Sequence, residues 1–220
     1  MVVLLNYSGH AAGAVVFDGG NPNGLVAGPI VTFTLADDFV LSATATVTGS
    51  EFWTLNRPAS RWNGEFSWFV IIDEGLGPAS TPFLTGDGDN ATAIATGRTF
   101  GPVDDLKDEF YWSFRFPEPI LLQARTVYWL GITIEEDAVG VGPQGIFWEA
   151  ADSAFGASVR RADYIHSTNS FINWTELTPA RSAAFRLDGS PIPEPCTLII
   201  WSLLGALAFT VGWWPRRRAA

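Results

Sequence analysis

Apolar and polar residues alternate with a period of two along several segments of the chain. In residues 38–48 every odd position is apolar after Asp38, whereas positions 42, 44, 46 and 48 carry Ser or Thr. The same alternation returns in residues 65–73, which include Trp68, and in residues 109–116, which include Trp112. Because successive side chains of a strand point to opposite faces, each segment is predicted to be a strand with one face in a core.

Further strands are expected where short apolar runs lie between turns. These runs are residues 15–18, 126–134, 145–149, 169–174 and 182–187. Together they give a set of about eight to ten strands. Turns rich in Gly, Pro and Asn separate the strands, and Pro117 and Pro119 interrupt one strand end, as at a sheet edge. The pattern predicts an all-β fold, a two-sheet antiparallel β-sandwich.

The last 30 residues depart from this pattern. They contain the box Pro193-Glu194-Pro195 with Cys196, the uncharged apolar run 197–214, and the basic end Arg216-Arg217-Arg218. A helix of about 18 residues spans about 27 Å, close to the hydrocarbon thickness of a bilayer. The run is therefore predicted to be a single C-terminal transmembrane helix, with the arginines on the cytoplasmic side and the bulk of the chain outside.

The three parts of this tail resemble the PEP-CTERM sorting signal of Gram-negative bacteria. In that family a Pro-Glu-Pro box precedes a hydrophobic helix and a short Arg-rich end, and the resemblance covers about residues 191–218. It implies an inner-membrane anchor that an exosortase-like transpeptidase cuts near the box, followed by transfer to the cell surface or extracellular matrix. Cys196 departs from the family, which usually has a small residue there. A lipidation signal would instead place the cysteine at the mature N-terminus.

The chain is thus divided into three parts. Residues 1–14 are interpreted as the remnant of a signal peptide, because Ala12-Gly13-Ala14 fits the small-x-small cleavage rule. The alternative is an irregular surface segment. Residues 15–190 form the predicted extracytoplasmic sandwich, and residues 191–220 form the sorting tail. Short motifs such as Ala36-Asp37-Asp38-Phe39 and residues 184–189 resemble a jelly-roll sandwich of exported bacterial proteins, a fold that several carbohydrate-binding modules share.

Charge and cysteine content exclude several classes of function. The chain has 13 basic and 23 acidic residues, for a net charge of −10, so a nucleic acid would be repelled. Cys196 is the only cysteine, which excludes an intramolecular disulfide, a thiolate metal cluster and a dithiol redox site. The predicted domain must therefore be stabilised by packing.

Catalytic residues are hard to assemble from this sequence. His166 has only Asp163 nearby, His10 lies in the signal segment, and no hydrolase elbow, zinc pair or phosphate loop occurs. Paired carboxylates could cleave a glycan. Their candidates are Glu65, Asp73, Glu109, Glu135, Glu136 and Glu149. Nothing in the sequence brings two of them together, so a non-enzymatic protein is expected and a glycoside hydrolase is the least favoured alternative.

Two further patterns suggest ligands without catalysis. Asp87, Asp89 and Asn90 have the oxygen density of a structural calcium site, with Asp37-Asp38 as a weaker option, although no cofactor is required. Trp62 and Trp174 lie between polar residues and are the best candidates for stacking on sugar rings. The sequence therefore favours an exported surface or matrix protein, with a carbohydrate-binding module for exopolysaccharide as the alternative.

Overall fold

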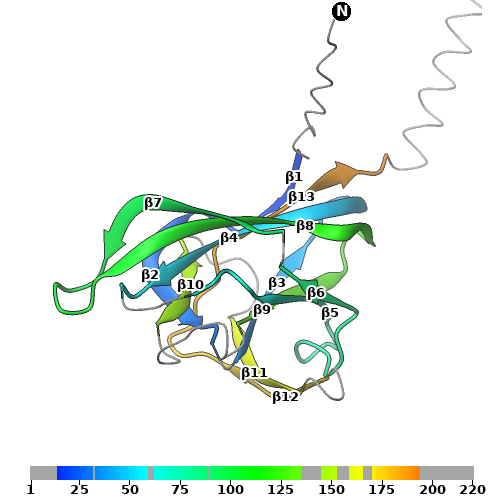
Figure 1. Cartoon of the computed structure of the whole chain (residues 1–220). Coiled ribbons are helices and arrows are strands. Elements are labelled where there is room, and N and C mark those ends of the chain that lie inside the picture. Colours follow the sequence, from blue (N-terminus) through cyan, green and yellow to red (C-terminus); the bar gives the residue numbers. More distant parts are fainter. Residues whose placement is uncertain are drawn as a thin grey trace, which may run out of the picture.

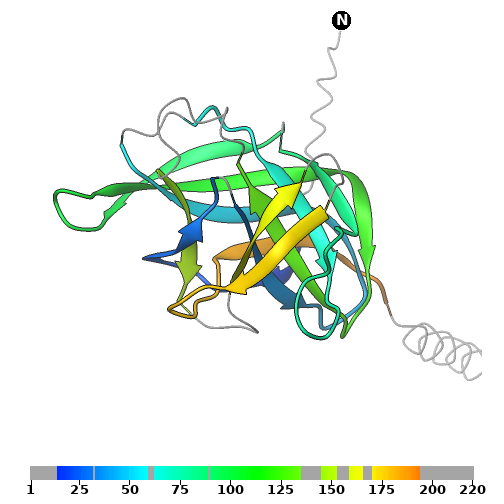
Figure 2. The ribbon, with the colours of Figure 1, turned by 90° about the horizontal axis from the view of Figure 1, so that it is seen from below.

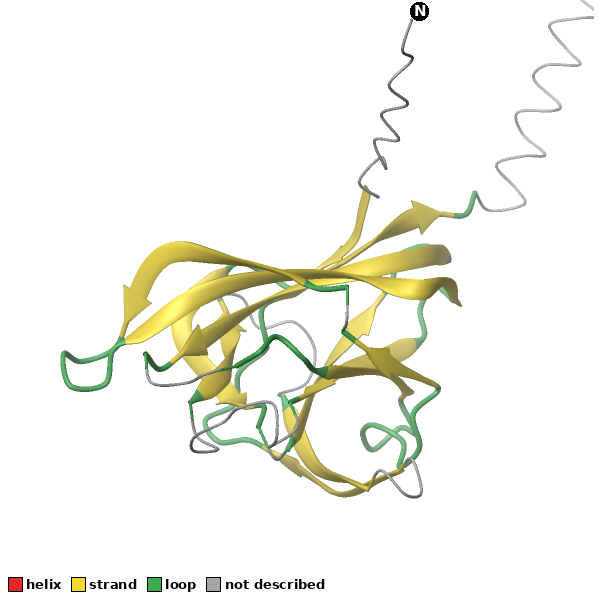
Figure 3. Ribbon diagram, viewed as in Figure 1, coloured by secondary structure: helices red, strands yellow, loops and turns green. Residues whose placement is uncertain are grey.

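The computed structural model describes residues 14–31, 33–58, 62–88, 90–134, 145–152, 159–165 and 170–193. Within them the chain forms strands and no helix, arranged in two antiparallel sheets (Figures 1 and 3). The sheets pack face to face as a β-sandwich. The prediction of an all-β fold with two antiparallel sheets is confirmed.

The larger sheet is built around one long central strand, β4. Its strands are β1 (Ala14–Asp18), β2 (Pro22–Pro29), β4 (Ala45–Asn56), β7 (Thr92–Phe100), β8 (Lys107–Leu122), β10 (Ile146–Ala151) and β13 (Phe185–Pro191). β8 pairs along the whole of one side of β4, while β13 and β10 follow each other along its other side. β7 extends the sheet beyond β8, β1 beyond β13, and β2 beyond β10.

The smaller sheet has the order β12-β11-β3-β9-β5-β6. Its strands are β3 (Thr34–Val40), β5 (Ser67–Ile72), β6 (Leu84–Asp87), β9 (Val127–Thr133), β11 (Arg160–Ile165) and β12 (Ser170–Glu176). Ile30 joins the two sheets at one corner, because its N–H donates to Ile146 O and its carbonyl accepts from the N–H of Ile134. The β7–β8 hairpin extends beyond the smaller sheet at one end of the molecule (Figures 1 and 2).

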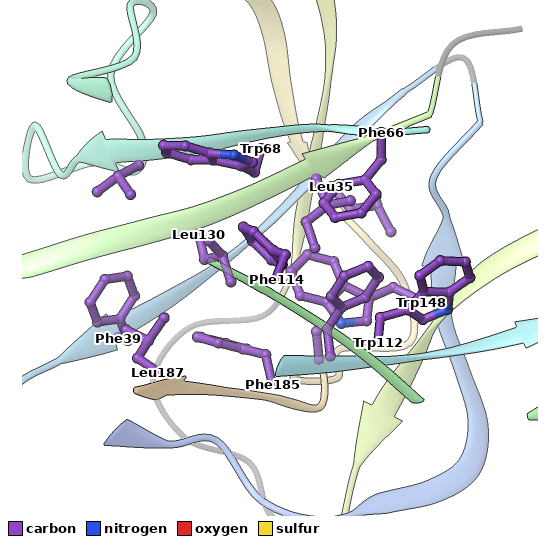
Figure 4. Packing of buried hydrophobic residues seen from close by; sticks show 14 of the residues in the cluster. Leu35, Phe39, Phe66, Trp68, Trp112, Phe114, Leu130, Trp148, Phe185 and Leu187 are labelled. Atoms are coloured by element: carbon purple, nitrogen blue, oxygen red, sulfur yellow. The ribbon is translucent and has the colours of Figure 1, made fainter. Parts of the chain in front are cut away.

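The space between the sheets is filled by large apolar side chains (Figure 4). Trp112, Phe114 and Phe185 come from the larger sheet and meet Phe66 and Leu130 from the side of the smaller one. The indole N–H of Trp112 donates to Thr54 Oγ1 at 3.0 Å, so its burial leaves no unpaired donor. Burial of Trp68 and Trp112 confirms the face that the alternation assigned to them.

The alternation predicted one strand over residues 38–48, but these residues belong to two strands. β3 ends at Val40 and β4 begins at Ala45, and the two strands belong to different sheets. Leu41 lies in the turn between them, where its carbonyl accepts from the N–H of Arg125 at 3.0 Å. Because both sheets face the same core, the period of two continues across the turn and conceals it.

Pro117 and Pro119 interrupt the pairing of β8 at a sheet edge, as predicted, but they do not lie at the end of the strand. β8 continues through both prolines to Leu122, and its pairing with β4 jumps from Gly49–Arg115 to Val47–Ile120. The residues between Arg115 and Ile120 therefore form a bulge. β7 pairs with β8 only as far as Ser113, so within the described residues this stretch has a free edge and the missing proline N–H groups cost no sheet bond.

Candidate functional site

A cleft of about 710 Å³ opens at the end of the sandwich that carries the β7–β8 hairpin. Its walls come from residues 56–58 at the end of β4, residues 62–65 before β5, residues 88, 91 and 93, and the start of β8. The residues that shape it include Asn56, Trp62, Glu65, Asp108, Phe110 and Trp112. This volume is in the range of clefts that bind small molecules or short oligomers.

The cleft forms where the inner face of β8 emerges from the core. Every second residue of this strand faces the cleft side, namely Phe114, Trp112, Phe110 and Asp108. Their burial falls from nearly complete at Phe114 to partial at Phe110 and Asp108. Ala93 pairs with Trp112 across the β7–β8 ladder, and its small side chain leaves the space open. The floor of the cleft is therefore a continuation of the hydrophobic core.

Trp62 forms one wall and is held in a fixed orientation. Its indole N–H donates to the carbonyl of Glu65 at 2.8 Å, and its ring centroid lies 4.0 Å from that of Trp112 with an interplanar angle of 41°. Asn63 Oδ1 accepts from the N–H of Glu65 at 2.9 Å and closes the turn. The sequence placed Trp62 in a polar turn; the structure adds that it is half-buried against Trp112 and lines the cleft.

Trp174, the other predicted stacking residue, does not share this cleft. It packs against Phe171, with ring centroids 5.0 Å apart, beside a small cluster on the smaller sheet that includes Phe69 and Trp129. Its indole N–H donates to the carbonyl of Ala79 at 3.1 Å. The structure thus separates the two tryptophans that the sequence indicated as stacking candidates, Trp62 first and Trp174 second.

The cleft also contains polar side chains that the sequence did not indicate, Asn56 and Arg57. Asn56 lies opposite Asp108 in the β4–β8 ladder, and its Oδ1 is buried without a donor among the described residues. Arg57 donates from Nε to Asp105 Oδ1 at 2.8 Å. Hydrogen bonds from Lys107 and Arg57 lower the pKa of Asp105. Asn56 carried no signal in the sequence, because its role depends on the strand register.

Two of the six predicted carboxylates do come together, but away from the cleft. Glu109 and Glu149 lie on the outer face of the larger sheet, and both are buried. Glu109 Oε1 pairs with Arg98 Nη1 at 3.2 Å, and Glu149 Oε1 accepts from the N–H of Gly24 at 2.6 Å. Burial and the neighbouring Glu109 raise the pKa of Glu149 to about 8. Neither carboxyl group lines the cleft, so the pair is not placed to act on a ligand there.

The other predicted carboxylates have varied surroundings. Glu65 lines the cleft. Asp73 accepts from the indole N–H of Trp129 at 3.0 Å and from the N–H of Gly75 at 2.7 Å, which is a structural role in a turn. Glu135, Glu136 and His166 lie outside the described residues.

The predicted calcium site is only partly within the described residues, since Asp89 lies outside them. Asn90 is engaged with Arg115: its Nδ2 donates to the carbonyl and its Oδ1 accepts from the N–H, both at 2.9 Å. Asp87 Oδ1 accepts from Ser67 Oγ at 3.3 Å. No group of three or more metal-ligating His, Cys, Asp or Glu side chains occurs in the part of the chain that the structure describes. Calcium at Asp87, Asp89 and Asn90 stays a prediction.

Asp37, the weaker calcium option, is buried in the sandwich. Its Oδ2 accepts from the N–H of Ala183 at 2.7 Å and so ties β3 to the segment before β13. Burial raises the pKa of the Asp37 carboxyl well above its usual range, and this hydrogen bond opposes the shift.

The sorting tail lies almost entirely outside the described residues. Pro193 is described and exposed, whereas Glu194, Pro195, Cys196, the run 197–214 and Arg216-Arg217-Arg218 are not described, and neither are residues 1–13. Among the described residues there is no helix with the length and apolarity needed to cross a membrane. In comparisons with known proteins, no family model and no curated protein matches this chain.

Proposed function

We propose that this chain is a non-enzymatic, exported surface or extracellular-matrix protein whose β-sandwich binds a carbohydrate chain at Trp62. The observation that supports binding is the cleft itself: a concave surface with two tryptophan rings and a phenylalanine beside amide and carboxylate groups. Sugar rings present apolar C–H faces and polar edges. A wall of aromatic rings with acceptors at its margin matches both.

The fixed orientation of Trp62 favours this proposal over an accidental hollow. A free surface tryptophan would lose side-chain freedom on binding, which reduces affinity. Trp62 is already ordered by its bond to Glu65 and by its contact with Trp112. The ligand would therefore meet a surface that is ordered before binding.

Export and sorting form the second half of the proposal, and the sequence of the tail supports them. The Pro193-Glu194-Pro195 box, the apolar run and the Arg-rich end resemble the three parts of a PEP-CTERM signal. We expect residues 15–190 to lie outside the cytoplasm as a jelly-roll-like sandwich. The run 197–214 would hold the precursor in the inner membrane until an exosortase-like transpeptidase cleaves it.

Sedimentation with insoluble polysaccharides, including the exopolysaccharide of the host, tests the binding half. Trp62→Ala should abolish co-sedimentation, because it removes one wall of the cleft. Trp174→Ala is the matched control, since Trp174 is also half-buried and hydrogen-bonded but does not line the cleft. Equal binding by the wild type and Trp62→Ala would contradict the proposal.

A further inference from the structure

β7 leaves a free edge on the larger sheet. Within the described residues it pairs only with β8, so every second residue of its first half directs its N–H and C=O away from the sheet. Thr92–Thr99 are exposed on both faces of the strand, and Ile94 keeps 53% of its surface accessible. An edge of this kind is a template for pairing with another strand.

The other outermost strands of the two sheets have features that oppose such pairing. β2 has a proline at each end, Pro22 and Pro29, and β1 has only five residues. β6 has four residues, the last of which is Asp87, and β12 is interrupted by Asn173 with a positive φ of 57°. Residues 92–96 of β7 contain no proline and no charge, so this edge lacks that protection.

The free segment of β7 reads the same in both directions. Residues 92–96 are Thr-Ala-Ile-Ala-Thr, centred on Ile94. If two copies pair antiparallel around a two-fold axis at this centre, Ile94 faces Ile94, each Thr92 faces a Thr96, and each Ala93 faces an Ala95. Thr–Thr pairs stabilise antiparallel strands, and the two Ile94 side chains cover each other's apolar surface. The segment is therefore complementary to itself in this register.

The structure limits the pairing segment at both ends. Gly97 has a positive φ of 78°, and the pairing of β7 with β8 shifts register there, so the strand bends after Thr96. At the other end, the N–H of Ala91 donates to Gly88 O at 2.8 Å in a turn. The extended part of the edge thus coincides with the self-complementary segment.

The charges along the edge are compatible with this pairing. Between residues 90 and 98 the only charged side chain is Arg98, which forms an ion pair with Glu109 of its own chain at 3.2 Å. The position opposite Arg98 in the two-fold register is Asn90, so no like charges meet along the strands. The net charge of −10 repels a second copy at longer range, and salt screens this repulsion.

We propose that two copies of this chain associate by antiparallel pairing of Thr92–Thr96 around a two-fold axis at Ile94. The two larger sheets then form one continuous sheet. Five residues a side are fewer than the roughly 20 to 30 of a standard interface, so the dimer is weak and depends on concentration. Because Ala93 lines the cleft at Trp62 in each copy, the two clefts border the same seam.

Sedimentation velocity of the full chain over a concentration series measures this association. Detergent micelles are kept in excess over protein, so that two chains do not share a micelle by chance. The wild type should pass from monomer to dimer as its concentration rises. Ile94→Lys places two like charges opposite each other and should weaken dimerisation at least about tenfold. Ile172→Lys is the matched control and should dimerise as the wild type does, since Ile172 is also an exposed isoleucine on an outermost strand.

A mixture of two variants tests the register itself. Ile94→Lys and Ile94→Glu should each stay monomeric alone, whereas the mixture should form a 1:1 dimer because opposite charges then face each other at position 94. A wild type that remains monomeric throughout the series, or an Ile94→Lys variant that dimerises as tightly as the wild type, would overturn the proposal. A mixture that remains monomeric would do the same, because position 94 would then not face itself.

Discussion

Glu149 is a residue whose protonation the fold controls. It is fully buried, beside Glu109 and the ion pair between Glu109 and Arg98, and it accepts from the N–H of Gly24. Burial raises its pKa from 4.5 to about 8, so the folded protein binds its proton more tightly than the unfolded chain does. The sequence identified Glu149 only as one of six acidic candidates, because no pattern reveals which two carboxylates a sheet register brings together.

This raised pKa predicts a loss of stability as the pH rises from 4.5 to about 8. Between pH 4.5 and about 8 the unfolded chain releases the Glu149 proton while the folded protein keeps it, so this contribution falls as pH rises through that window and is constant above it. Glu149→Gln, a neutral isostere, should match the wild type at pH 4 and exceed it at pH 9 in urea unfolding. Glu118→Gln, at an exposed position, is the control. An equal difference at both pH values would contradict the assignment.

The burial of strand faces explains which strands could be predicted from the sequence. Alternation located β8, because its even positions 112, 114 and 116 are buried while the odd positions between them are more exposed, but it gave no sign of β7, whose residues Thr92–Thr99 are all exposed. It also left Phe69 and Ile71 of β5 unassigned, although both are fully buried under a second cluster on the far side of the smaller sheet. A strand covered on both faces, or on neither, has no contrast between its faces to detect.

Gly189 lies where the pairing of β13 with β4 shifts register. A Cβ atom there would meet the carbonyl oxygen of Thr46 closer than atoms can approach. Gly189→Ala should therefore force the two strands apart and lower the free energy of unfolding by about 1 to 3 kcal/mol. The neighbouring exposed Ser190→Ala should change it by less than about 0.5 kcal/mol. Chemical denaturation measures both, and equal stability would show that the bulge adapts.

In the whole molecule, the cleft lies at the Asn56 end of β4, and Pro191 of β13 pairs with Ala45 at the other end of the same strand. The all-β class followed from composition and alternation, but the cleft did not. Its residues come from four separate segments, which meet through the pairing of Asn56 with Asp108, the pairing of Ala93 with Trp112 and the contact of Trp62 with Trp112. Trp62 stood out in the sequence because polar residues surround it, whereas Asn56 became visible only through its burial.

The sorting box gives a prediction for the whole chain in its host. If a transpeptidase recognises Pro193-Glu194-Pro195, Glu194→Ala should leave membrane insertion intact and stop cleavage, so that the uncut precursor accumulates. Gly205→Arg is the contrasting variant: a charge near the helix centre costs about 2.5 to 3.5 kcal/mol on insertion, so it should release the protein from the membrane. Intact mass spectrometry of the surface-exposed form gives the result. A wild-type form that retains residues 201–220 would contradict sorting.

The most direct test of carbohydrate binding is to observe the tryptophans during a titration. In a spectrum of ¹⁵N-labelled full chain, each indole N–H gives its own resonance, and those of Trp62 and Trp112 report on the cleft whereas that of Trp174 does not. As a β-1,4-linked hexasaccharide of glucose or of mannose is added, the Trp62 and Trp112 resonances should shift together and saturate while Trp174 stays fixed. Saturable shifts at Trp174 alone, or no shift at Trp62 with either hexasaccharide, would contradict the binding of carbohydrate in this cleft.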